Sequence, residues 1–299
     1  MPKSGVTRKA AAVAVFTLVA LSAVPAAQAR YSTGISDQHP NTFGNPLFRL
    51  LGLRYARLVM PWDAFHYSAD RTMVETWLAA AHATGVRPLV SFSHSRVRPR
   101  KLPSVRQYRS VFRQFRARYP WIRDYSPWNE ANHQSQPTFH KPKWAARYYN
   151  AVHSSCRHCK IVALDVLDQP GMTDYVRGFR RYAHGSPRLW GLHNYRDTNR
   201  FRTRGTRAFL RAVRGKVWLT ETGGIVRFAN SLPYSEKRAA RATKFMFRLA
   251  NSNRRITRLY IYSWQGEPRG ARFDSGLVGP DGHARPAYYV VLKKLRRHR

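Results

Sequence analysis

Glutamate is scarce in this sequence, and two glutamates stand where they could do chemistry together. The chain contains 53 Lys and Arg against 15 Asp and Glu, and only five of these acids are glutamates. Glu130 and Glu221 each follow a strand-like segment. Two carboxyl groups flanking one space can cleave a glycosidic bond, one protonated to assist the leaving group and one ionised to attack the anomeric carbon. The alternative is that both glutamates pair with the many arginines for purely structural reasons.

The elements that would position these glutamates alternate regularly along the chain. Amphipathic, helix-like stretches such as 71–84, 105–119, 143–155 and 235–252 separate apolar, strand-like runs. Eight strands are predicted, at 31–37, 55–61, 87–93, 122–128, 160–166, 189–195, 216–221 and 258–264. Such alternation is typical of parallel βαβ units, and eight units predict a single-domain α/β protein with a (β/α)₈ (TIM) barrel over residues 30–299. The competing fold, a doubly wound open sheet, would usually carry a Gly-rich turn after its first strand, and that turn is missing.

The spacing of the two glutamates fits this barrel. They lie 91 residues apart, about three βα units of roughly 30 residues each. Glu130 is therefore expected at the end of strand four and Glu221 at the end of strand seven, and these two strands face each other across the mouth of a barrel. Asp165 and Asp168 also fall near a strand end, where sugar binding and loop capping both fit. His94 is left open between a structural role and a sugar contact.

Short motifs around these positions resemble a known group of enzymes. Trp128-Asn129-Glu130 and Leu219-Thr220-Glu221 resemble clan A glycoside hydrolases, which include cellulases, mannanases and xylosidases, although the family within the clan is unresolved. Further similarities lie on strands two, six and eight, at Arg57, His193-Asn194-Tyr195 and Trp264. The resemblance implies a retaining glycoside hydrolase on a (β/α)₈ barrel.

Within that resemblance, Glu130 is the implied general acid and base, and Glu221 is the implied nucleophile. Burial and a neighbouring carboxylate are expected to raise the pKa of Glu130, so that it carries a proton. The resemblance implies that Tyr195 donates to Glu221 and that Arg57 keeps Glu221 ionised. The structural alternative is that Arg57 is only a buried cation and Tyr195 only a core aromatic.

The remaining implied site residues would contact the sugar. The resemblance implies that Asn129 binds the 2-hydroxyl and that Trp264 forms an apolar floor beneath the cleaved ring. His193 is as well explained by a structural role as by sugar binding, and Trp264 could be an ordinary core residue. Neither a cofactor nor a metal is expected.

The predicted function is a retaining glycoside hydrolase that cleaves β-linked glycans by double displacement. A transglycosylase with the same catalytic pair is one alternative, and a non-catalytic carbohydrate- or polyanion-binding barrel is another. The expected partner is a polysaccharide or oligosaccharide, with an acidic one favoured by the charge. Specific nucleic-acid binding is not expected, because no recognisable module accompanies the charge. The protein is expected to be a monomer.

The first 29 residues predict a secretory signal peptide. Basic residues precede the apolar run 10–24, and Ala27-Gln28-Ala29 forms a small-x-small cleavage site. The apolar run is shorter than the roughly 20 residues that span a bilayer, so we expect no membrane span once the peptide is removed. The mature protein is therefore predicted to be extracellular, either free or associated with the cell wall.

Charge and cysteines add two further expectations. Without its first 29 residues the chain has a formal charge of +35, which predicts salt-sensitive attraction to polyanions. A basic groove for an acidic glycan is one interpretation of the segment 96–101, and a solvated rim is the other. Cys156 and Cys159 are the only cysteines. In an exported protein they predict a local disulfide between a helix and a strand, and not a redox centre.

Overall fold

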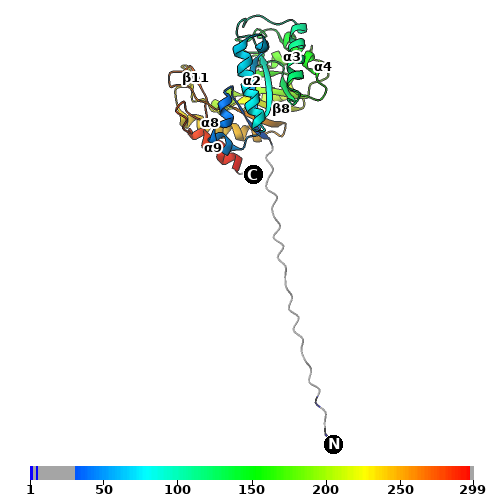
Figure 1. Ribbon diagram of the computed structural model, residues 1–299. Coiled ribbons are helices and arrows are strands. Elements are labelled where there is room, and N and C mark those ends of the chain that lie inside the picture. The colour runs from blue at the N-terminus through cyan, green and yellow to red at the C-terminus, as the bar shows by residue number, and fades with distance from the viewer. Residues whose placement is uncertain (3–4, 6–30, 297–299) are drawn as a thin grey trace.

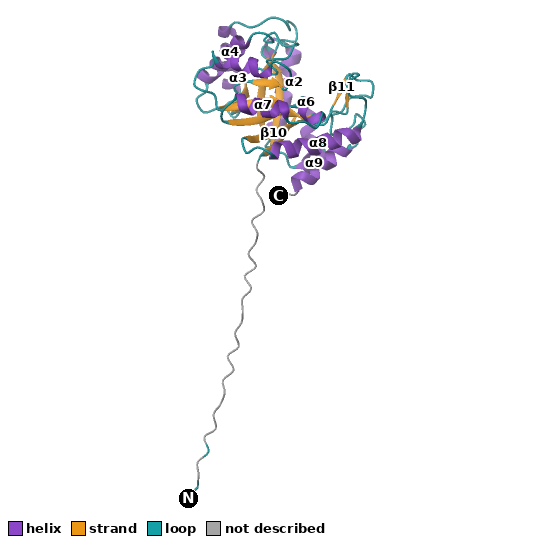
Figure 2. Cartoon of the chain, turned by 180° about the vertical axis from the view of Figure 1, so that it is seen from behind, coloured by secondary structure: helices purple, strands orange, loops and turns teal. Residues whose placement is uncertain are grey.

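Parallel strands form the centre of the molecule, and helices surround them (Figures 1 and 2). The computed structural model describes residues 1–2, 5 and 31–296, so the predicted signal peptide lies almost entirely outside the described residues. The principal strands are β1 Ser32–Ser36, β2 Tyr55–Pro61, β3 Arg87–Ser93, β4 Asp124–Ser126, β5 Lys160–Ile161, β6 Asp165–Leu167, β7 Leu189–His193, β8 Lys216–Thr222 and β10 Ile256–Tyr262. Their order is β5-β4-β3-β2-β1-β10-β8-β7-β6.

The sheet closes into a barrel through the segment 160–167. Its first part, β5, pairs in parallel with β4, and its last part, β6, pairs in parallel with β7. Between them the backbone N–H of Val162 donates to Tyr125, and that of Ala163 donates to Leu189. This segment is the fifth barrel strand, which passes from one neighbour to the other. The predicted (β/α)₈ barrel is confirmed, with one domain over the described residues.

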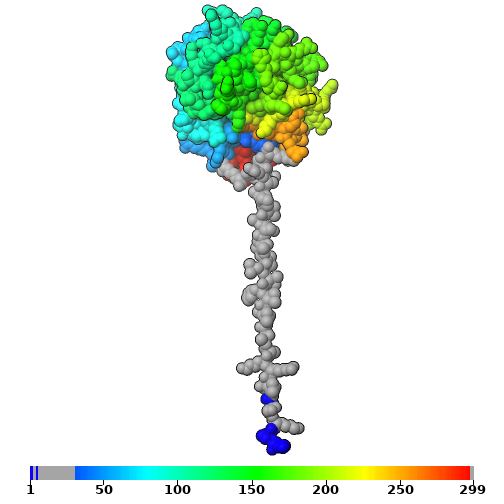
Figure 3. Space-filling model, turned by 90° about the vertical axis from the view of Figure 1, so that its right-hand side faces the viewer, coloured from blue at the N-terminus to red at the C-terminus, as the bar shows by residue number. Residues whose placement is uncertain are grey.

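Helices cover the outside of the barrel and follow the strands in turn. Figure 3 shows the flank on which α3 and α4 gather. The helices are α1 Pro46–Leu51, α2 Ser68–Ala83, α3 Val105–Arg118, α4 Pro142–Ser155, α5 Met172–Arg180, α6 Tyr195–Asn199, α7 Arg204–Ala212, α8 Glu236–Asn251 and α9 Pro286–Arg296, with single 3₁₀ turns at Pro40–Gly44 and Ala64–His66. Within the described part of the chain, no helix combines the length and apolar character that crossing a membrane requires.

Helix α3 shows why these segments are helical. Ser104 and Gln107 form a reciprocal capping box, which satisfies two backbone N–H groups at the first turn. Tyr108, Phe112 and Phe115 recur at three- and four-residue steps and are buried against the barrel. The exposed positions between them carry the polar residues Ser110, Arg113 and Gln114. The periodicity seen in the sequence is thus the burial pattern of the helix.

The barrel interior has an apolar layer and a polar layer. Side chains two residues apart on a strand point to the same face, so one strand can contribute to two successive layers. Leu89, Val162, Trp218 and Tyr260 form a buried apolar cluster. Ser91 lies two residues beyond Leu89 on β3, and Thr220 lies two residues beyond Trp218 on β8. Ser91 and Thr220 are both fully buried. The polar layer therefore lies toward the carboxyl ends of the strands.

A second, two-stranded sheet borders the same end of the barrel. β9 Arg227–Phe228 pairs antiparallel with β11 Phe273–Asp274, so the chain after strand seven is joined to the chain after strand eight. These two segments lie far apart in the sequence. Their pairing builds one wall at the carboxyl end of the barrel.

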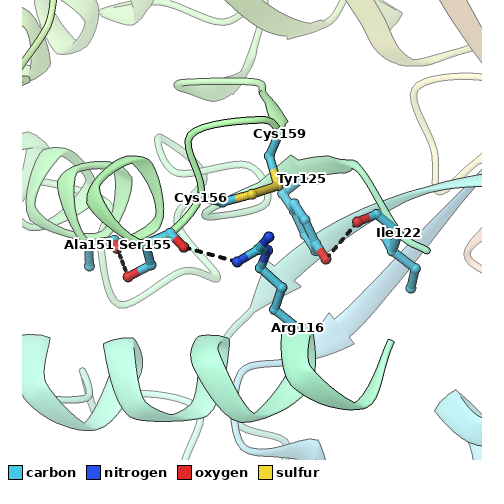
Figure 4. Close-up of a disulfide and its surroundings, with 7 residues drawn as sticks. All are labelled: Arg116, Ile122, Tyr125, Ala151, Ser155, Cys156 and Cys159. Carbon is cyan, nitrogen blue, oxygen red and sulfur yellow. Dashed lines mark hydrogen bonds between the residues drawn. A yellow bond between two sulfur atoms is a disulfide. The ribbon is translucent and has the colours of Figure 1, made fainter. Parts of the chain in front are cut away.

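The two cysteines form a disulfide between α4 and β5 (Figure 4). Cys156 follows the last residue of α4, and Cys159 precedes the first residue of β5. Arg116 of α3 donates to the carbonyl of Ser155 beside the bridge. The predicted disulfide and its place between a helix and a strand are confirmed.

Candidate active site

Arg57 lies at the centre of the polar layer. Its side chain is 0% exposed and donates to both carboxylates that face it, with Nη1 2.7 Å from Glu221 Oε2 and Nη2 3.1 Å from Asp165 Oδ2. Nε and Nη1 also donate to the hydroxyls of Ser91 and Ser36. Burial opposes the charge of the guanidinium, but the carboxylates of Asp165 and Glu221 outweigh it and raise the pKa of Arg57. Arg57 is therefore a fixed cation beneath Glu221.

Glu221 is held at both of its oxygens. It is the sixth residue of β8, close to the carboxyl end of the strand. The hydroxyl of Tyr195, the first residue of α6, donates to Oε1 at 2.9 Å, while Arg57 donates to Oε2. The structure thus brings together Arg57, Tyr195 and Glu221 as the sequence predicted. The cation Arg57 and the hydroxyl of Tyr195 therefore hold the carboxyl group of Glu221 from two sides.

Glu130 does not end a strand, contrary to expectation. Strand β4 spans only Asp124–Ser126, and Glu130 lies in the turn that follows, with a φ of 45°. This left-handed conformation is uncommon for a residue other than glycine and persists where surrounding contacts hold it. The N–H of Ala131 donates to the carbonyl of Asp165, and that of His133 donates to the carbonyl of Glu130. The turn directs Glu130 to the barrel mouth.

His193 lies between the carboxylates, fully buried at the end of β7. Its Nδ1 is 3.0 Å from Glu130 Oε1 and 3.8 Å from Glu221 Oε2. Nε2 is 3.1 Å from Asp165 Oδ1 and 3.3 Å from Nη2 of Arg57. The nearby guanidinium would favour an unprotonated Nε2, but three carboxylates surround the ring against that single cation. Burial alone would lower the pKa of His193, yet the charges of Asp165 and Glu221 and the hydrogen bonds with Asp165 and Glu130 raise it to about 10.

Asp165 is a residue whose role the sequence did not reveal. It neither faces the solvent nor caps a loop. Its side chain is 0% exposed and accepts from Arg57, Ser126 and Thr220. Burial by itself would raise the pKa of Asp165, but the charges of His193 and Arg57 lower it well below its usual range. Gly191 makes room for this carboxylate, since a Cβ there would lie 2.5 Å from Asp165 Oδ1.

The expectation of a raised pKa for Glu130 is wrong for this structure. Burial does act to raise it. The hydrogen bond from His193 and the charges of His193, His133 and Arg57 are together stronger and lower the pKa of Glu130 below its ordinary value. The reason is the buried imidazolium, which the sequence analysis had not assigned to Glu130. A proton therefore resides on His193 and not on Glu130 in the resting site.

Glu130 and Glu221 approach each other closely. One carboxylate oxygen of each and a ring nitrogen of His193 all lie within 4.8 Å of one another. These are atom types that a metal ion also accepts. Both oxygens of Glu221 already accept hydrogen bonds from Arg57 and Tyr195, however, and a cation is already present in His193. The arrangement favours proton transfer and nucleophilic attack by carboxylates.

Asn129 is oriented by the same network. Its Oδ1 accepts from Nη2 of Arg57 at 2.5 Å, and its backbone N–H donates to the carbonyl of Phe92. With Oδ1 engaged, the amide retains its N–H donors for a ligand hydroxyl. This geometry fits the predicted contact with a sugar.

Trp264 does not form the floor of the site. Its indole is 1% exposed and packs edge-on against Phe48 and Tyr288, beneath α1 and α9. The cause is the backbone, which leaves the barrel after Tyr262. The N–H of Trp264 donates to Asp37 Oδ2, and its carbonyl accepts from Val278. Tyr262, the last residue of β10, lines the cavity instead.

The catalytic candidates line a cavity of about 710 Å³, a volume typical of a small-ligand site. One wall is aromatic, with Phe273 in ring contact with Tyr195, Phe228 and Tyr262. This wall comes from the pairing of β9 with β11. The sequence does not predict this wall, because only scattered aromatic residues in two long loops indicate it.

The rim of the cavity is basic. Arg196, Arg200 and Arg202 line it beside α6. Asp168 also lines it and caps α6, accepting from the backbone of Arg196 and Asp197, which agrees with the capping alternative. Burial raises the pKa of Asp168 to about 7, against these backbone hydrogen bonds. Among the described residues lining the cavity none comes from 96–101, so this segment does not supply a basic groove to this site.

No family model matches the sequence, and no curated protein matches it. Solved structures share the fold. A family GH10 endoxylanase from a sugarcane soil metagenome aligns with a TM-score of 0.62 and 13% identity, over 89% of this chain and 96% of that one. Xylanase 10B from Thermotoga maritima aligns with a TM-score of 0.61 and 12% identity, over 92% and 98%. A family 39 glycoside hydrolase from Bacteroides cellulosilyticus WH2 aligns with a TM-score of 0.58 and 14% identity, over 88% of this chain.

The chain spans only 63% of the length of that Bacteroides enzyme. At identities this low, the likeness establishes the barrel fold and leaves the reaction to the geometry of the site.

Proposed function

We propose that the protein is a retaining glycoside hydrolase of clan A that cleaves β-linked glycans. Glu221 is the nucleophile and Glu130 the general acid and base. The observation that carries the proposal is the close approach of these two carboxylates, with oxygens within 4.8 Å, above a cation fixed beneath one of them. The structural neighbours are named as glycosidases, which supports the reaction class.

The spacing of the carboxylates supports retention. Retaining enzymes separate the two groups by about 5–5.5 Å, whereas inverting enzymes need about 6.5–9.5 Å to admit a water molecule. In the first step Glu221 attacks the anomeric carbon while the leaving oxygen takes a proton from Glu130. In the second step Glu130 accepts a proton from water, and that water displaces Glu221 from the sugar. Two inversions return the original configuration.

Glu221 is prepared for attack by its partners. Arg57 and Tyr195 hold its oxygens in place, so little reorganisation precedes bond formation. Asn129 offers amide donors to the neighbouring hydroxyl of the bound sugar. The aromatic wall of Tyr262, Phe228 and Phe273 suits the apolar C–H faces of a sugar ring.

The proton for the first step is stored next to Glu130. His193 Nδ1 lies 3.0 Å from Glu130 Oε1, so the proton on His193 can pass to Glu130 along this hydrogen bond. When Glu130 is ionised, the carboxylates of Glu130, Glu221 and Asp165 carry three negative charges. Arg57 and His193 carry two positive charges, so the group has one net negative charge. A further proton on Glu130 makes this group neutral, which favours acid catalysis at mildly acidic pH.

We further propose that the substrate is acidic and that the protein acts outside the cell. Arg196, Arg200 and Arg202 at the rim would bind carboxylate or sulfate groups on the glycan. The predicted signal peptide supports export. A transglycosylase would use the same residues and would differ only in the group that accepts the sugar from Glu221.

Chemical rescue tests this proposal. The wild-type protein and the Glu130→Ala and Glu221→Ala variants are assayed on aryl β-glycosides with good and poor leaving groups. Glu221→Ala is expected to lose nearly all activity on both. Glu130→Ala is expected to keep glycosylation of the enzyme by good leaving groups and to release a β-glycosyl azide when azide is added.

The stereochemistry supplies the decisive measurement. NMR of the first-formed product is expected to show the anomeric configuration of the substrate. An inverted product would falsify the double displacement. The variant Glu236→Ala, in an acid outside the cavity, is the matched control and is expected to keep wild-type activity.

A further inference from the structure

Basic residues gather at the end of the barrel that lies opposite the catalytic cavity. Seven of its strands begin on a basic residue or immediately after one. These residues are Arg54, Arg87, Arg123, Lys160, Arg188, Lys216 and Arg255. Since all the barrel strands are parallel, their starting points meet at one end, remote from Glu130 and Glu221. The fold thus converts a scattered sequence feature into a ring of positive charge.

Six members of this ring are exposed and have no acidic partner. Arg255 is the exception, because its guanidinium donates to the carbonyls of Leu210, Val213 and Gly215. Among the residues that the structure describes, no ion pair joins any of the other six to an acid. Their charges therefore remain available to a ligand.

Two hollows pass between these side chains. One, of about 700 Å³, is lined by Arg157, Arg188 and Lys216, and the other, of about 500 Å³, by Arg87 and Arg123. Both hollows are also lined by Lys160 and Arg258, which makes them neighbours in one depression. We call this surface, with its seven lining arginines and lysines, the basal groove. Its members are Arg87, Arg123, Arg157, Lys160, Arg188, Lys216 and Arg258.

The basal groove contains hardly any negative charge. Asp124 is the one acid among its described lining residues, and Arg258 already neutralises it at 2.5 Å. The disulfide between Cys156 and Cys159 closes the loop that carries Arg157 and so restrains the backbone of this residue beside the groove. A rigid, positive depression of this kind focuses the field on an anionic chain.

The aromatic rings in the groove are already covered. The guanidinium of Arg258 lies 3.9 Å from the ring centres of both Tyr55 and Trp218. The imidazole of His82 lies 4.6 Å from the ring centre of Trp121. Single-stranded nucleic acids are bound largely by stacking of their bases on open aromatic faces. Recognition here must instead use the N–H donors of arginine and lysine, which suit a chain of regularly spaced anionic groups.

We propose that the basal groove binds an acidic polysaccharide, a glycan whose carboxylate or sulfate groups pair with the unpartnered cations. Arginine matches such planar or multidentate oxygen groups well. Binding of the polysaccharide in the basal groove would keep the protein attached to the polymer, while the cavity at the other end of the barrel stays accessible. This proposal does not depend on the chemistry of Glu130 and Glu221, because it concerns a separate surface.

Two triple variants with the same change of charge test the groove. Arg87→Ser, Lys160→Ser and Arg188→Ser remove two arginines and one lysine from it. Arg98→Ser, Arg100→Ser and Lys101→Ser remove the same residue types from an exposed loop at the other end of the barrel. Affinity for a fluorescent oligogalacturonide is measured by anisotropy over a range of salt concentrations. Thermal melting of both triples verifies that they fold.

The groove variant is expected to bind about tenfold more weakly at low salt and to show a shallower salt dependence. The loop variant is expected to change affinity by less than about threefold. Dextran sulfate should compete with the labelled chain, and neutral dextran should not.

Two results would overturn the proposal. Equal weakening in both triples would mean that overall charge, and not the basal groove, attracts the chain. Double-stranded DNA of matched charge binding more tightly than the oligogalacturonide, and losing that affinity in the groove variant, would reassign the groove to nucleic acid.

Discussion

The imidazole of His193 and the carboxylate of Glu130 share a hydrogen bond of 3.0 Å at the mouth of the barrel. His193 is fully buried and has a pKa raised to about 10 by the surrounding carboxylates, although burial alone would lower it. The same bond lowers the pKa of Glu130. The imidazole therefore controls when the proposed acid carries a proton.

Replacing His193 by glutamine is expected to move the rate profile to higher pH. Without the imidazolium, the ionised form of Glu130 loses its main stabilising partner, so its pKa rises and more enzyme is protonated near neutrality. The basic limb of the plot of kcat/KM against pH, measured on a substrate with a poor leaving group, should shift to higher pH. The maximum value of kcat/KM should fall by roughly tenfold, because the side chain of Glu130 is held less firmly in its orientation.

His133→Gln is the matched control for this profile. His133 Nδ1 is 3.9 Å from Glu130 Oε2, and its charge is a weaker influence on the pKa of Glu130. The shift should have the same sign and be smaller. An unchanged or downward-shifted limb in His193→Gln would contradict the assigned role of the imidazole.

The barrel itself could be predicted because local patterns determine it. Apolar runs at regular intervals reflect strands buried on both faces, and the stripe of Tyr108, Phe112 and Phe115 reflects one covered helix face. The prediction failed at β4, where only Asp124–Ser126 pair as a strand. Arg123, directly before β4, is exposed, and Pro127, directly after it, has no N–H to donate to a neighbouring strand.

The site was only partly predictable because several contacts are non-local. Arg57 and Glu221 were placed correctly by resemblance to known motifs. Asp165 was left undecided, since its partners Arg57 and Thr220 lie on distant strands. The aromatic wall depends on Phe228 pairing with Phe273, which no local pattern indicates. Only Ser263 separates Tyr262 from Trp264, and the path of the backbone decides which of the two aromatic residues faces the cavity.

Removal of the buried cation Arg57 should strongly destabilise the protein. Arg57→Met removes one of the two cations that face the carboxylates of Asp165 and Glu221 and leaves His193 as the other, which costs about 3–5 kcal/mol in a buried site. Adding Asp165→Asn removes one of these charges, so the double variant should recover part of the loss. Urea unfolding of the wild type, both single variants and the double variant measures this cycle. A double variant no more stable than Arg57→Met alone would rule out the charge imbalance as the cause.

Asp165 should also make the stability of the protein sensitive to acid. Its folded-state pKa is lowered, chiefly by His193 and Arg57 against the effect of burial. Its contribution is therefore present above the unfolded pKa of about 3.9 and lost as the pH falls toward the lower folded value. The free energy of unfolding should decline below about pH 4 more steeply in the wild type than in Asp165→Asn.

The disulfide should contribute little to global stability. Cys156 and Cys159 are three residues apart, so the bridge closes a short loop, worth about 2 kcal/mol of chain entropy. The double variant Cys156→Ser, Cys159→Ser should melt about 5 °C below the wild type or closer to it. Calorimetry measures the difference, and the wild type melted with a reductant is the control. A fall of more than about 10 °C would show that the bridge stabilises more than its own loop.

Tyr262 and Trp264 should separate catalysis from stability. Tyr262 lines the cavity, whereas Trp264 is buried between Phe48 and Tyr288. Tyr262→Ala removes an apolar surface beneath the sugar and should lower kcat/KM roughly 10- to 100-fold, with a modest loss of stability. Trp264→Phe leaves a void in the core and should lower the free energy of unfolding by more than about 1 kcal/mol while kcat/KM stays near wild type.

Kinetics on an aryl glycoside and urea unfolding of each variant decide between the two positions. Tyr262→Phe is the matched control, and it should keep most of the activity because the ring remains. If instead Trp264→Phe impairs kcat/KM at full stability and Tyr262→Ala does not, the floor of the site lies at Trp264, and the backbone path after β10 differs in the working enzyme.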